Sequence, residues 1–434
     1  MKNKLFYLIL TVVLLCCQSI IFGGSKVETF NLKNGIKVVY KQVEGRNLTA
    51  LKFCSPVSVA YENTDKAGVT TLLYSVMNQS TKKRDVNTLA TDIENLGSSI
   101  GFDVEYDFSG FNLECMSKYF DKTLEILTDI ITNPAFDEQE FEKQKILQIE
   151  SIKNRADNIT QTAYDKMINE FFPQDNPYSY TSYGKIETLQ KITKQDIIDT
   201  YNKIFTTKGI VITVVSDIDV SKIKSKLNKS FGSLKLTQEA IQPSVTNVLP
   251  LRDEKVYPAK FNQAFIIYAY DVPNIYNKDF YTLKLIASVL GSRMTSRLFI
   301  ELREKLGLAY EVNTRFPTRK NGSYFSIYIG LDKKNIQLTK DGIEKIMENL
   351  CTTPVPEQEL KDTKQYVKGV YLLANQPVER QAYNLMFGEI FGLGYQFNDL
   401  FIEELEKVTS ADILKVANKY FKQNPLKIIL RPEK

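Results

Sequence analysis

The sequence predicts an α+β fold of two duplicated domains, each a mainly antiparallel sheet covered by helices. At 434 residues the chain is too long for one ordinary hydrophobic core. Strand-like and helix-like runs follow one another in the same order in both halves of the chain. Matching segments recur at nearly one offset, which is 216 residues from Thr193 to Thr409 and 219 residues from Glu138 to Glu357. A repeat of this length indicates that a whole domain was duplicated.

Residues 1–24 have the pattern of a signal peptide. Lys2 and Lys4 precede an apolar run from Leu5 to Cys17, and Gly23 is one of several small residues at which cleavage could occur. The run is shorter than the ~20 apolar residues that a membrane span needs. Export is therefore expected, to the periplasm or to the extracytoplasmic side of a membrane. An uncleaved anchor and a lipidated Cys17 stay open as alternatives.

The first domain is expected to cover residues 25–236. Asn34 and Gly35 lie between two strand-like runs, and this pair is a strong signal for a β-hairpin. Further strands are expected over residues 49–54, 99–102, 108–115 and 209–215. Helical periodicity and helix stop signals predict helices over residues 68–77, 86–96, 116–131, 138–154, 160–171 and 194–205.

The second domain is expected to cover residues 259–434, after a linker over residues 237–258. The linker segment contains Pro243 and Pro250 and lacks helical periodicity. In the second domain a proline turn at Pro354 precedes a helix, as Pro134 does in the first domain. The last helix and strand, over residues 409–430, repeat the pattern of residues 193–215.

Residues 291–312 predict a helix followed by a strand. Leucine or methionine recurs at helical spacing, at Met294, Leu298, Leu302 and Leu306. Gly307 would end the helix in a left-handed conformation. Arg303 and Tyr310 would then project toward a common point and could hold a peptide carbonyl or a developing oxyanion. The alternative is an arginine on a solvated helix edge and a tyrosine packed in the sheet.

Composition excludes several functional classes. The net charge is +5, from 56 basic and 51 acidic residues that are interspersed, so no nucleic-acid partner is expected. The chain contains no histidine. This excludes histidine-based catalytic triads and every zinc site built on imidazole. After the signal segment, three widely spaced cysteines remain, Cys54, Cys115 and Cys351, and they are expected to be buried free thiols.

The duplicated pattern resembles the pitrilysin or insulinase family of zinc peptidases, in its two-domain branch, which includes the mitochondrial processing peptidase. The resemblance covers essentially the whole chain after the signal. Its most specific part is SRLF at residues 296–299, LREK at 302–305 and GLAY at 307–310, which looks like the family's second-domain substrate-binding motif. The resemblance implies that Arg303 and Tyr310 bind substrate.

The same family carries H-x-x-E-H on a helix of its first domain, where two histidines bind zinc and the glutamate activates water. The matching positions here are Thr71, Tyr74 and Ser75. The family's third ligand, a glutamate, corresponds to Ser151, although the adjacent Glu150 would fill that position after a shift of one residue. A lone carboxylate would not hold zinc. The chain is therefore expected to bind no metal cofactor.

Family members without the zinc helix are partners of active subunits. The resemblance thus implies a catalytically inactive, substrate-binding subunit of an exported heterodimeric zinc metallopeptidase. Such a chain would be inactive alone and would bind extended or unfolded peptides at a sheet edge, while a homologous partner supplies zinc and the base. The alternative is a noncatalytic peptide-binding or scaffold protein, like the core subunits of the respiratory bc1 complex. Partner, peptide preference and homodimer versus heterodimer stay open.

Overall fold

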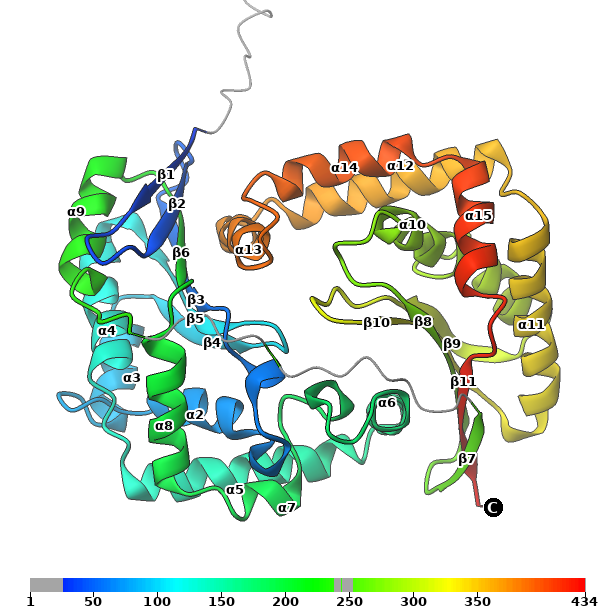
Figure 1. The fold of residues 1–434 in the computed structure, drawn as a ribbon, viewed down its shortest axis with the longest axis horizontal. Coiled ribbons are helices and arrows are strands. Elements are labelled where there is room, and N and C mark those ends of the chain that lie inside the picture. The colour runs from blue at the N-terminus through cyan, green and yellow to red at the C-terminus, as the bar shows by residue number, and fades with distance from the viewer. Residues whose placement is uncertain (1–25, 238–242, 244–252, 434) are drawn as a thin grey trace, which may run out of the picture.

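The computed structural model describes residues 26–237, 243 and 253–433, and it contains two α+β halves with one sheet each (Figure 1). The predicted signal peptide and most of the predicted linker lie outside the described residues. In the described part of the chain, no helix has the length and apolar character needed to cross a membrane. The three cysteines within it are buried free thiols, as expected.

The first sheet lies in residues 26–237 and has the strand order β1-β2-β6-β3-β5-β4. Its strands are β1 (Val27–Asn31), β2 (Lys37–Gln42), β3 (Leu48–Ser55), β4 (Ser99–Val104), β5 (Ser109–Met116) and β6 (Val211–Ser216). Only β2 and β6 pair in parallel, and the other pairs are antiparallel. Gly35 adopts a positive φ of 89° in the turn between β1 and β2, so the predicted hairpin is confirmed.

Helices cover one face of this sheet, and their apolar stripes form its core. They are α2 (Val69–Met77), α3 (Val86–Asn95), α4 (Phe120–Thr132), α5 (Glu138–Arg155), α7 (Ile186–Leu189), α8 (Lys194–Phe205) and α9 (Val220–Phe231). The remaining helix of this half, α6 (Ile159–Phe171), packs on the other sheet. Helix α9 is absent from the sequence-based expectations, although its signals are regular. Asp219 caps its first turn, and Ile223, Leu227 and Phe231 form a buried stripe at helical spacing.

The second sheet has the strand order β7-β11-β8-β10-β9. Its strands are β7 (Glu254–Ala259), β8 (Ala264–Val272), β9 (Ala309–Arg315), β10 (Ser323–Leu331) and β11 (Leu426–Pro432). Strand β7 begins inside the predicted linker of residues 237–258, so the second domain starts earlier than the sequence indicates. The cause is long-range, because β7 is held by parallel pairing with β11 at the far end of the chain.

The second half also contains a π-helix, η5 (Phe299–Lys305). Its α-helices are α10 (Phe280–Leu290), α11 (Ile336–Thr352), α12 (Glu357–Ala374), α13 (Val378–Ile390), α14 (Phe397–Lys407) and α15 (Ser410–Tyr420). Single-turn helices across the chain are η1 (Val59–Tyr61), η2 (Thr64–Lys66), η3 (Ser117–Tyr119), η4 (Pro177–Ser179) and η6 (Lys333–Asn335).

The two halves repeat one architecture. Strands β2-β6-β3-β5-β4 correspond in order and direction to β7-β11-β8-β10-β9, with a parallel pair at the start of each series. The helix before the last strand of each half begins with the same capping box. Thr193 and Asp196 form it in α8, and Thr409 and Asp412 form it in α15, 216 residues later. The predicted fold class is confirmed.

The halves exchange one helix each, as Figure 1 shows, with α13 beside the first sheet and α6 beside the second. Val378, Ala382 and Leu385 of α13 pack on the sheet residues Val39 and Ala50. Ala163 and Met167 of α6 belong to the core cluster over β8 and β11. Each sheet is thus covered by its own helices on one face and by a helix of the other half on the opposite face.

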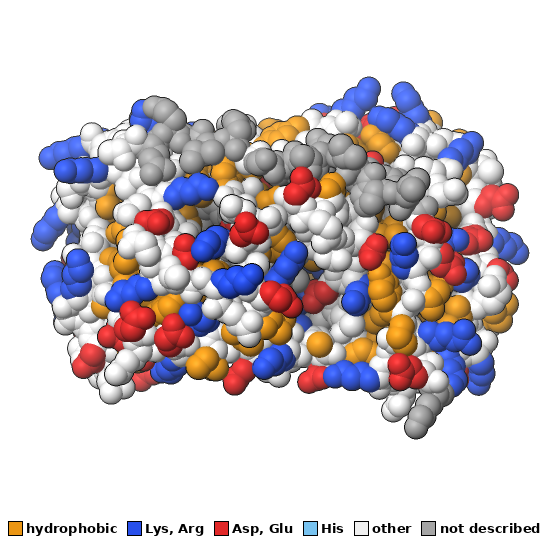
Figure 2. Space-filling view, turned by 60° about the horizontal axis from the view of Figure 1, so that its bottom comes forward, with side chains coloured by type: hydrophobic (Ala, Val, Ile, Leu, Met, Phe, Trp, Pro, Cys, Tyr) orange, Lys and Arg blue, Asp and Glu red, His pale blue; other side chains and the backbone are white. Residues whose placement is uncertain are grey.

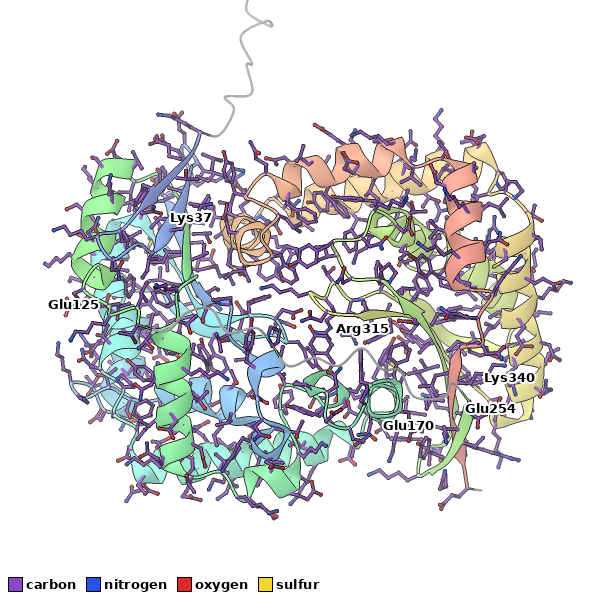
Figure 3. All side chains as sticks on the ribbon, in the orientation of Figure 1. Lys37, Glu125, Glu170, Glu254, Arg315 and Lys340 are labelled. Atoms are coloured by element: carbon purple, nitrogen blue, oxygen red, sulfur yellow. The ribbon has the colours of Figure 1, made fainter. Side chains whose placement is uncertain are left out.

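Polar contacts reinforce this exchange. Lys37 of β2 forms an ion pair of 2.6 Å with Glu389 of α13, and the Tyr257 hydroxyl donates a hydrogen bond of 2.7 Å to Glu170 of α6; Figure 3 labels Lys37 and Glu170. Charged side chains elsewhere are mixed. On the face drawn in Figure 2, basic and acidic side chains are interspersed, without a broad patch of one sign.

Candidate functional site

The predicted substrate-binding motif lies at the junction of η5 and β9. Gly307 separates the two elements with a φ of 62°, a left-handed conformation that glycine adopts without strain, as expected for the predicted helix stop. The Leu308 amide donates a hydrogen bond of 2.8 Å to the Leu302 carbonyl across this turn. The turn places Arg303 near the end of the π-helix and Tyr310 at the start of the strand.

Arg303 and Tyr310 are both exposed. The Arg303 guanidinium carbon lies 4.9 Å from the centre of the Phe299 ring, and Tyr310 keeps 63% of its surface accessible. Within the described residues neither side chain forms a hydrogen bond or an ion pair, and no contact joins them to each other. Both groups therefore have their donors free for a ligand. Their predicted role in binding substrate stays a prediction.

The prediction of one apolar stripe on this helix is correct for two of its four residues. Leu298 and Leu302 are fully buried, but Met294 is 75% exposed and Leu306 is 50% exposed. The segment forms a π-helix, whose hydrogen bonds join residues five apart. Residues four apart therefore drift around its axis instead of sharing one face, and Met294 precedes the helix altogether.

Strand β9, which carries Tyr310, is an edge of the second sheet. It pairs with β10 on one side, and no other described strand pairs with its outer edge. Burial along it departs from strict alternation, since Ala309 and Val312 are buried and both residues between them are exposed. Tyr310 lies at a register shift opposite Gly330 and Leu331. An exposed edge of this kind can accept an extended peptide as an added strand. Its counterpart in the first half, β4, is also an edge strand.

The positions matching the zinc motif lie on α2, and two of them have structural roles. Thr71 is buried, with 8% of its surface exposed, and its hydroxyl donates a hydrogen bond of 2.6 Å to the Ser182 carbonyl. Tyr74 is fully buried, its hydroxyl donates to Ser109 Oγ over 3.1 Å, and its ring centre lies 5.0 Å from that of Phe111. Burial raises the pKa of Tyr74 well above its usual value.

Ser75 and Ser151 complete the four predicted positions. Ser75 is half-buried on α2, and its carbonyl accepts a hydrogen bond from Gln79. The Ser151 hydroxyl donates to the Leu147 carbonyl of its own helix, α5, over 2.9 Å. Glu150 is exposed, whereas Ser151 is half-buried, and adjacent helix residues point about 100° apart. The carboxylate next to Ser151 therefore lies on a different side of α5.

Gln148 is a site residue that the sequence analysis missed. It is buried on α5, one turn before Ser151, and its Nε2 donates to the Gly68 carbonyl (3.0 Å) and to the Tyr183 carbonyl (2.8 Å). It thereby ties α5 to the start of α2 and to the segment that accepts the Thr71 hydrogen bond. Gln148 precedes Ser151 by three residues, so the two lie on the same face of the helix, and this spacing could have identified Gln148 from the sequence.

These residues do not fit a zinc ion. The donors at the four motif positions are neutral hydroxyls, and those of Thr71, Tyr74 and Ser151 already donate hydrogen bonds within the protein. Zinc in proteins takes imidazole, thiolate or carboxylate ligands. No cluster of three or more His, Cys, Asp or Glu side chains suited to a metal ion occurs among the described residues.

A buried carboxylate lies at the start of α2. The Gly68 and Thr70 amides donate hydrogen bonds of 3.0 Å and 2.9 Å to Glu62. Burial raises the pKa of Glu62 to about 7, against the opposing effect of these hydrogen bonds. This carboxylate is therefore a titrating group at the N-terminus of the helix that corresponds to the family's zinc helix.

Two family models match the chain in sequence. The model described as insulinase (peptidase family M16) matches residues 54–184, and the model described as peptidase M16 inactive domain matches residues 191–367. The chain belongs to the insulinase family, M16. This confirms the resemblance that the motifs indicated.

Relatives within the M16 family cover most of the chain. An uncharacterized zinc protease of Rickettsia felis is 26% identical over 93% of this chain and 98% of its own length. A protein of Helicobacter pylori named a non-peptidase homolog, YmxG, is 23% identical over 80% of this chain and 81% of its own. The crystal structure of a protease from Helicobacter pylori superposes with a TM-score of 0.86 at 22% identity, covering 94% of this chain and all of that one. The match to the inactive-domain model and the similarity to a non-peptidase homolog support an inactive member of the family, in agreement with the absence of histidine.

Proposed function

We propose that this chain is the inactive, substrate-binding subunit of an exported heterodimeric zinc metallopeptidase. The observation that carries the proposal is a contrast between two parts of one family site. Arg303 and Tyr310 are exposed near the outer edge of β9 and form no hydrogen bond or ion pair with a described residue. Thr71 and Tyr74, in contrast, are held in structural contacts. A homologous partner would supply the H-x-x-E-H helix, its zinc ion and the general base.

In this proposal the peptide adds to β9 as an extended strand. Main-chain hydrogen bonds to the free edge would provide most of the affinity, so the sequence preference would be broad. The Arg303 guanidinium and the Tyr310 hydroxyl would donate hydrogen bonds to the carbonyl oxygen of the peptide. Donors placed where negative charge develops stabilise the transition state of peptide hydrolysis more than the bound substrate.

The decisive experiment is co-expression with an exported M16 homologue that carries H-x-x-E-H. A stable complex is expected, and Arg303→Ala and Tyr310→Phe are each expected to lower its kcat/KM for an extended peptide at least ~10-fold, because one transition-state donor is lost. The chain purified alone is expected to hold no stoichiometric zinc and to cleave no peptide.

Matched controls come from the same chain. Arg431→Ala changes an exposed arginine on β11, and Tyr119→Phe removes a hydroxyl from η3 in the first half; both complexes should keep full activity. If the complex forms and folds but the Arg303 and Tyr310 variants keep the wild-type rate, the chain is instead a noncatalytic scaffold of the same fold.

The export part of the proposal rests on residues 1–24, and its test is separate. Expression of the full chain in a bacterium, followed by cell fractionation and N-terminal sequencing, is expected to place the protein outside the cytoplasm. Recovery of the protein with Met1 intact in the cytoplasm would refute export. The proposed roles of Arg303 and Tyr310 do not depend on this result.

A further inference from the structure

A cavity of about 360 Å³ lies where the two halves meet. The first half contributes Glu105 to Phe108, in the turn between β4 and β5. The second half contributes α10, the loop between β9 and β10, and the facing parts of α12, α13 and α14. The volume is within the range of about 300–1,000 Å³ that small-molecule sites occupy. The cavity shares no residue with the predicted pair Arg303 and Tyr310.

Four basic side chains line this cavity, namely Lys284, Arg315, Arg319 and Arg380. None of them forms an ion pair with a described residue. Figure 3 labels Arg315, which lies between the two halves. The Lys284 Nζ donates to the Phe316 carbonyl (2.9 Å) and to Thr318 Oγ1 (3.1 Å), both uncharged groups. Burial without a counter-ion lowers the pKa of Lys284 to about 8.

Aromatic rings hold the three guanidinium groups in place. The guanidinium carbon of Arg319 lies 3.7 Å from the ring centre of Tyr106, and that of Arg380 lies 4.6 Å from the ring centre of Tyr383. The Arg319 Nε is buried without a hydrogen-bond partner. A guanidinium group stacked on a ring keeps its N–H donors in its own plane and directed outward, so they can bind a carboxylate through two parallel hydrogen bonds.

The acidic side chains of the cavity do not balance these cations. The lining contains two carboxylates against four basic side chains. One is Asp107, whose oxygens accept hydrogen bonds from the Tyr178 hydroxyl (2.5 Å) and from the Lys320 amide (3.1 Å). The remaining carboxylate is Glu105, whose pKa is raised by burial. The cavity therefore has an excess of positive charge at neutral pH.

The rest of the wall is aromatic. Phe387 and Phe391 of the α13 segment stack with ring centres 4.2 Å apart, and Phe397 and Phe401 of α14 lie next to them in the lining. Aromatic walls favour flat apolar groups that stack on them. The lining thus combines basic side chains that form no ion pair with a described residue and a wall of aromatic rings. This combination fits a ligand that carries a negatively charged group on an aromatic ring.

We propose that this cavity binds an aromatic carboxylate, which is either the C-terminal phenylalanine or tyrosine of a peptide or a free aromatic acid. The carboxylate accepts hydrogen bonds from the guanidinium groups of Arg315 or Arg380 and from Lys284, and the ring stacks on the phenylalanines of α13 and α14. The site lies in this chain alone, so its test needs no partner subunit and is independent of the proposed function.

The test is calorimetric titration of the purified full chain with three probes. N-acetylphenylalanine is expected to bind, and its C-terminal amide, which lacks the charge, is expected to bind at least 10-fold more weakly. A hexapeptide ending in phenylalanine identifies the source: at least 10-fold tighter binding than N-acetylphenylalanine indicates a peptide C-terminus, and equal or weaker binding indicates a free acid. Equal affinity for acid and amide, or no binding of the acid and the hexapeptide, overturns the proposal.

Variants locate the site. Arg380→Gln and Lys284→Met are each expected to weaken N-acetylphenylalanine binding at least 5-fold, while Arg431→Gln, on the exposed part of β11, leaves it unchanged. Arg380 is exposed on α13, so this variant is expected to fold even if Lys284→Met does not. In the wild-type chain, bound N-acetylphenylalanine should slow reductive methylation of Lys284, measured by mass spectrometry. Unchanged affinity in folded Arg380→Gln, or unchanged methylation, places any binding elsewhere and overturns the proposal.

Discussion

The match to the zinc motif sets Tyr74 at the position of the motif's glutamate, and its side chain lies in an aromatic environment. Its ring lies between Phe102, Phe111 and Phe205, and its hydroxyl reaches Ser109. An ionised carboxylate in this apolar surrounding would have no cation to pair with. Tyr74 is therefore part of the aromatic core, and a glutamate in its place would bury a charge there.

Substitutions at Tyr74 test this view. Tyr74→Phe keeps the ring and removes one hydrogen bond, so it is expected to lower the free energy of unfolding by about 0.5–1.5 kcal/mol. Tyr74→Glu creates a cavity and buries a charge, and it is expected to cost at least ~3 kcal/mol. Urea unfolding of the two variants compares these values. If Tyr74→Glu were as stable as Tyr74→Phe, the position would tolerate a buried carboxylate, and this view would be wrong.

At the scale of the element, contacts at the N-terminal end of helix α2 fix its position. Glu62 accepts hydrogen bonds from the amides at its N-terminus, where a negative charge is favourable. Gly68 has a φ of 96°, and a Cβ there would lie 2.5 Å from the Tyr183 carbonyl oxygen, so only glycine fits. Gln148 then joins this end to α5.

The pKa of Glu62 makes the stability of this element depend on pH. The folded pKa of about 7 lies above the ordinary value of 4.5, so between these values the folded state holds the proton more tightly than the unfolded chain. Stability from Glu62 is therefore present at pH 4.5 and is lost as the pH rises to about 7, by roughly 1–3 kcal/mol. Urea unfolding at pH 5 and pH 8 measures this loss, and Glu62→Gln should reduce it. An unchanged pH dependence in that variant would rule out Glu62 as its source.

Element prediction from the sequence was accurate where local signals suffice and failed where they do not. Helix α8 was predicted with its observed bounds, Lys194–Phe205, because its capping box and apolar spacing are local. Strand β7 was assigned to a linker, since its pairing partner β11 lies far away in the sequence. The π-helical turn of η5 also escaped prediction, because an α-helical pattern of four-residue spacing does not distinguish the two helix types.

At the scale of the whole molecule, the exchange of α6 and α13 makes the two halves one unit. Lys52 of β3 is only 2% exposed, and it pairs with Asp103 of its own half (2.9 Å) and with Glu379 of α13 (2.5 Å). Burial by itself lowers the pKa of Lys52, but the two carboxylates outweigh it and raise the pKa above its usual value. Its contribution to stability is therefore present at neutral pH and is lost only in strongly alkaline solution.

Removal of this lysine should loosen the junction of the halves. Lys52→Met fills a similar volume but leaves two partly exposed carboxylates without their cation, so a loss of about 1–3 kcal/mol in the free energy of unfolding is expected. Urea unfolding measures the loss, and limited proteolysis should show faster cleavage near α13. Lys334→Met, at an exposed ion pair with Asp332 at the start of η6, is the matched control and should change stability by less than about 1 kcal/mol. Equal effects of the two variants would contradict a special role for Lys52.

The sequence by itself determined the duplication, most of the elements and the loss of the zinc ligands, because these depend on residue identity, local spacing and the complete absence of histidine. It also placed Gly307 between the motif helix and the strand that carries Tyr310. Only the tertiary structure decided that α6 and α13 each pack on the sheet of the other half, that β9 lies at the edge of its described sheet and that Tyr74 is buried in an aromatic core. It also decided that four basic side chains, without an ion pair to any described residue, line a cavity between the halves. These features come from contacts between residues far apart in the chain, and local periodicity carries no information about such contacts.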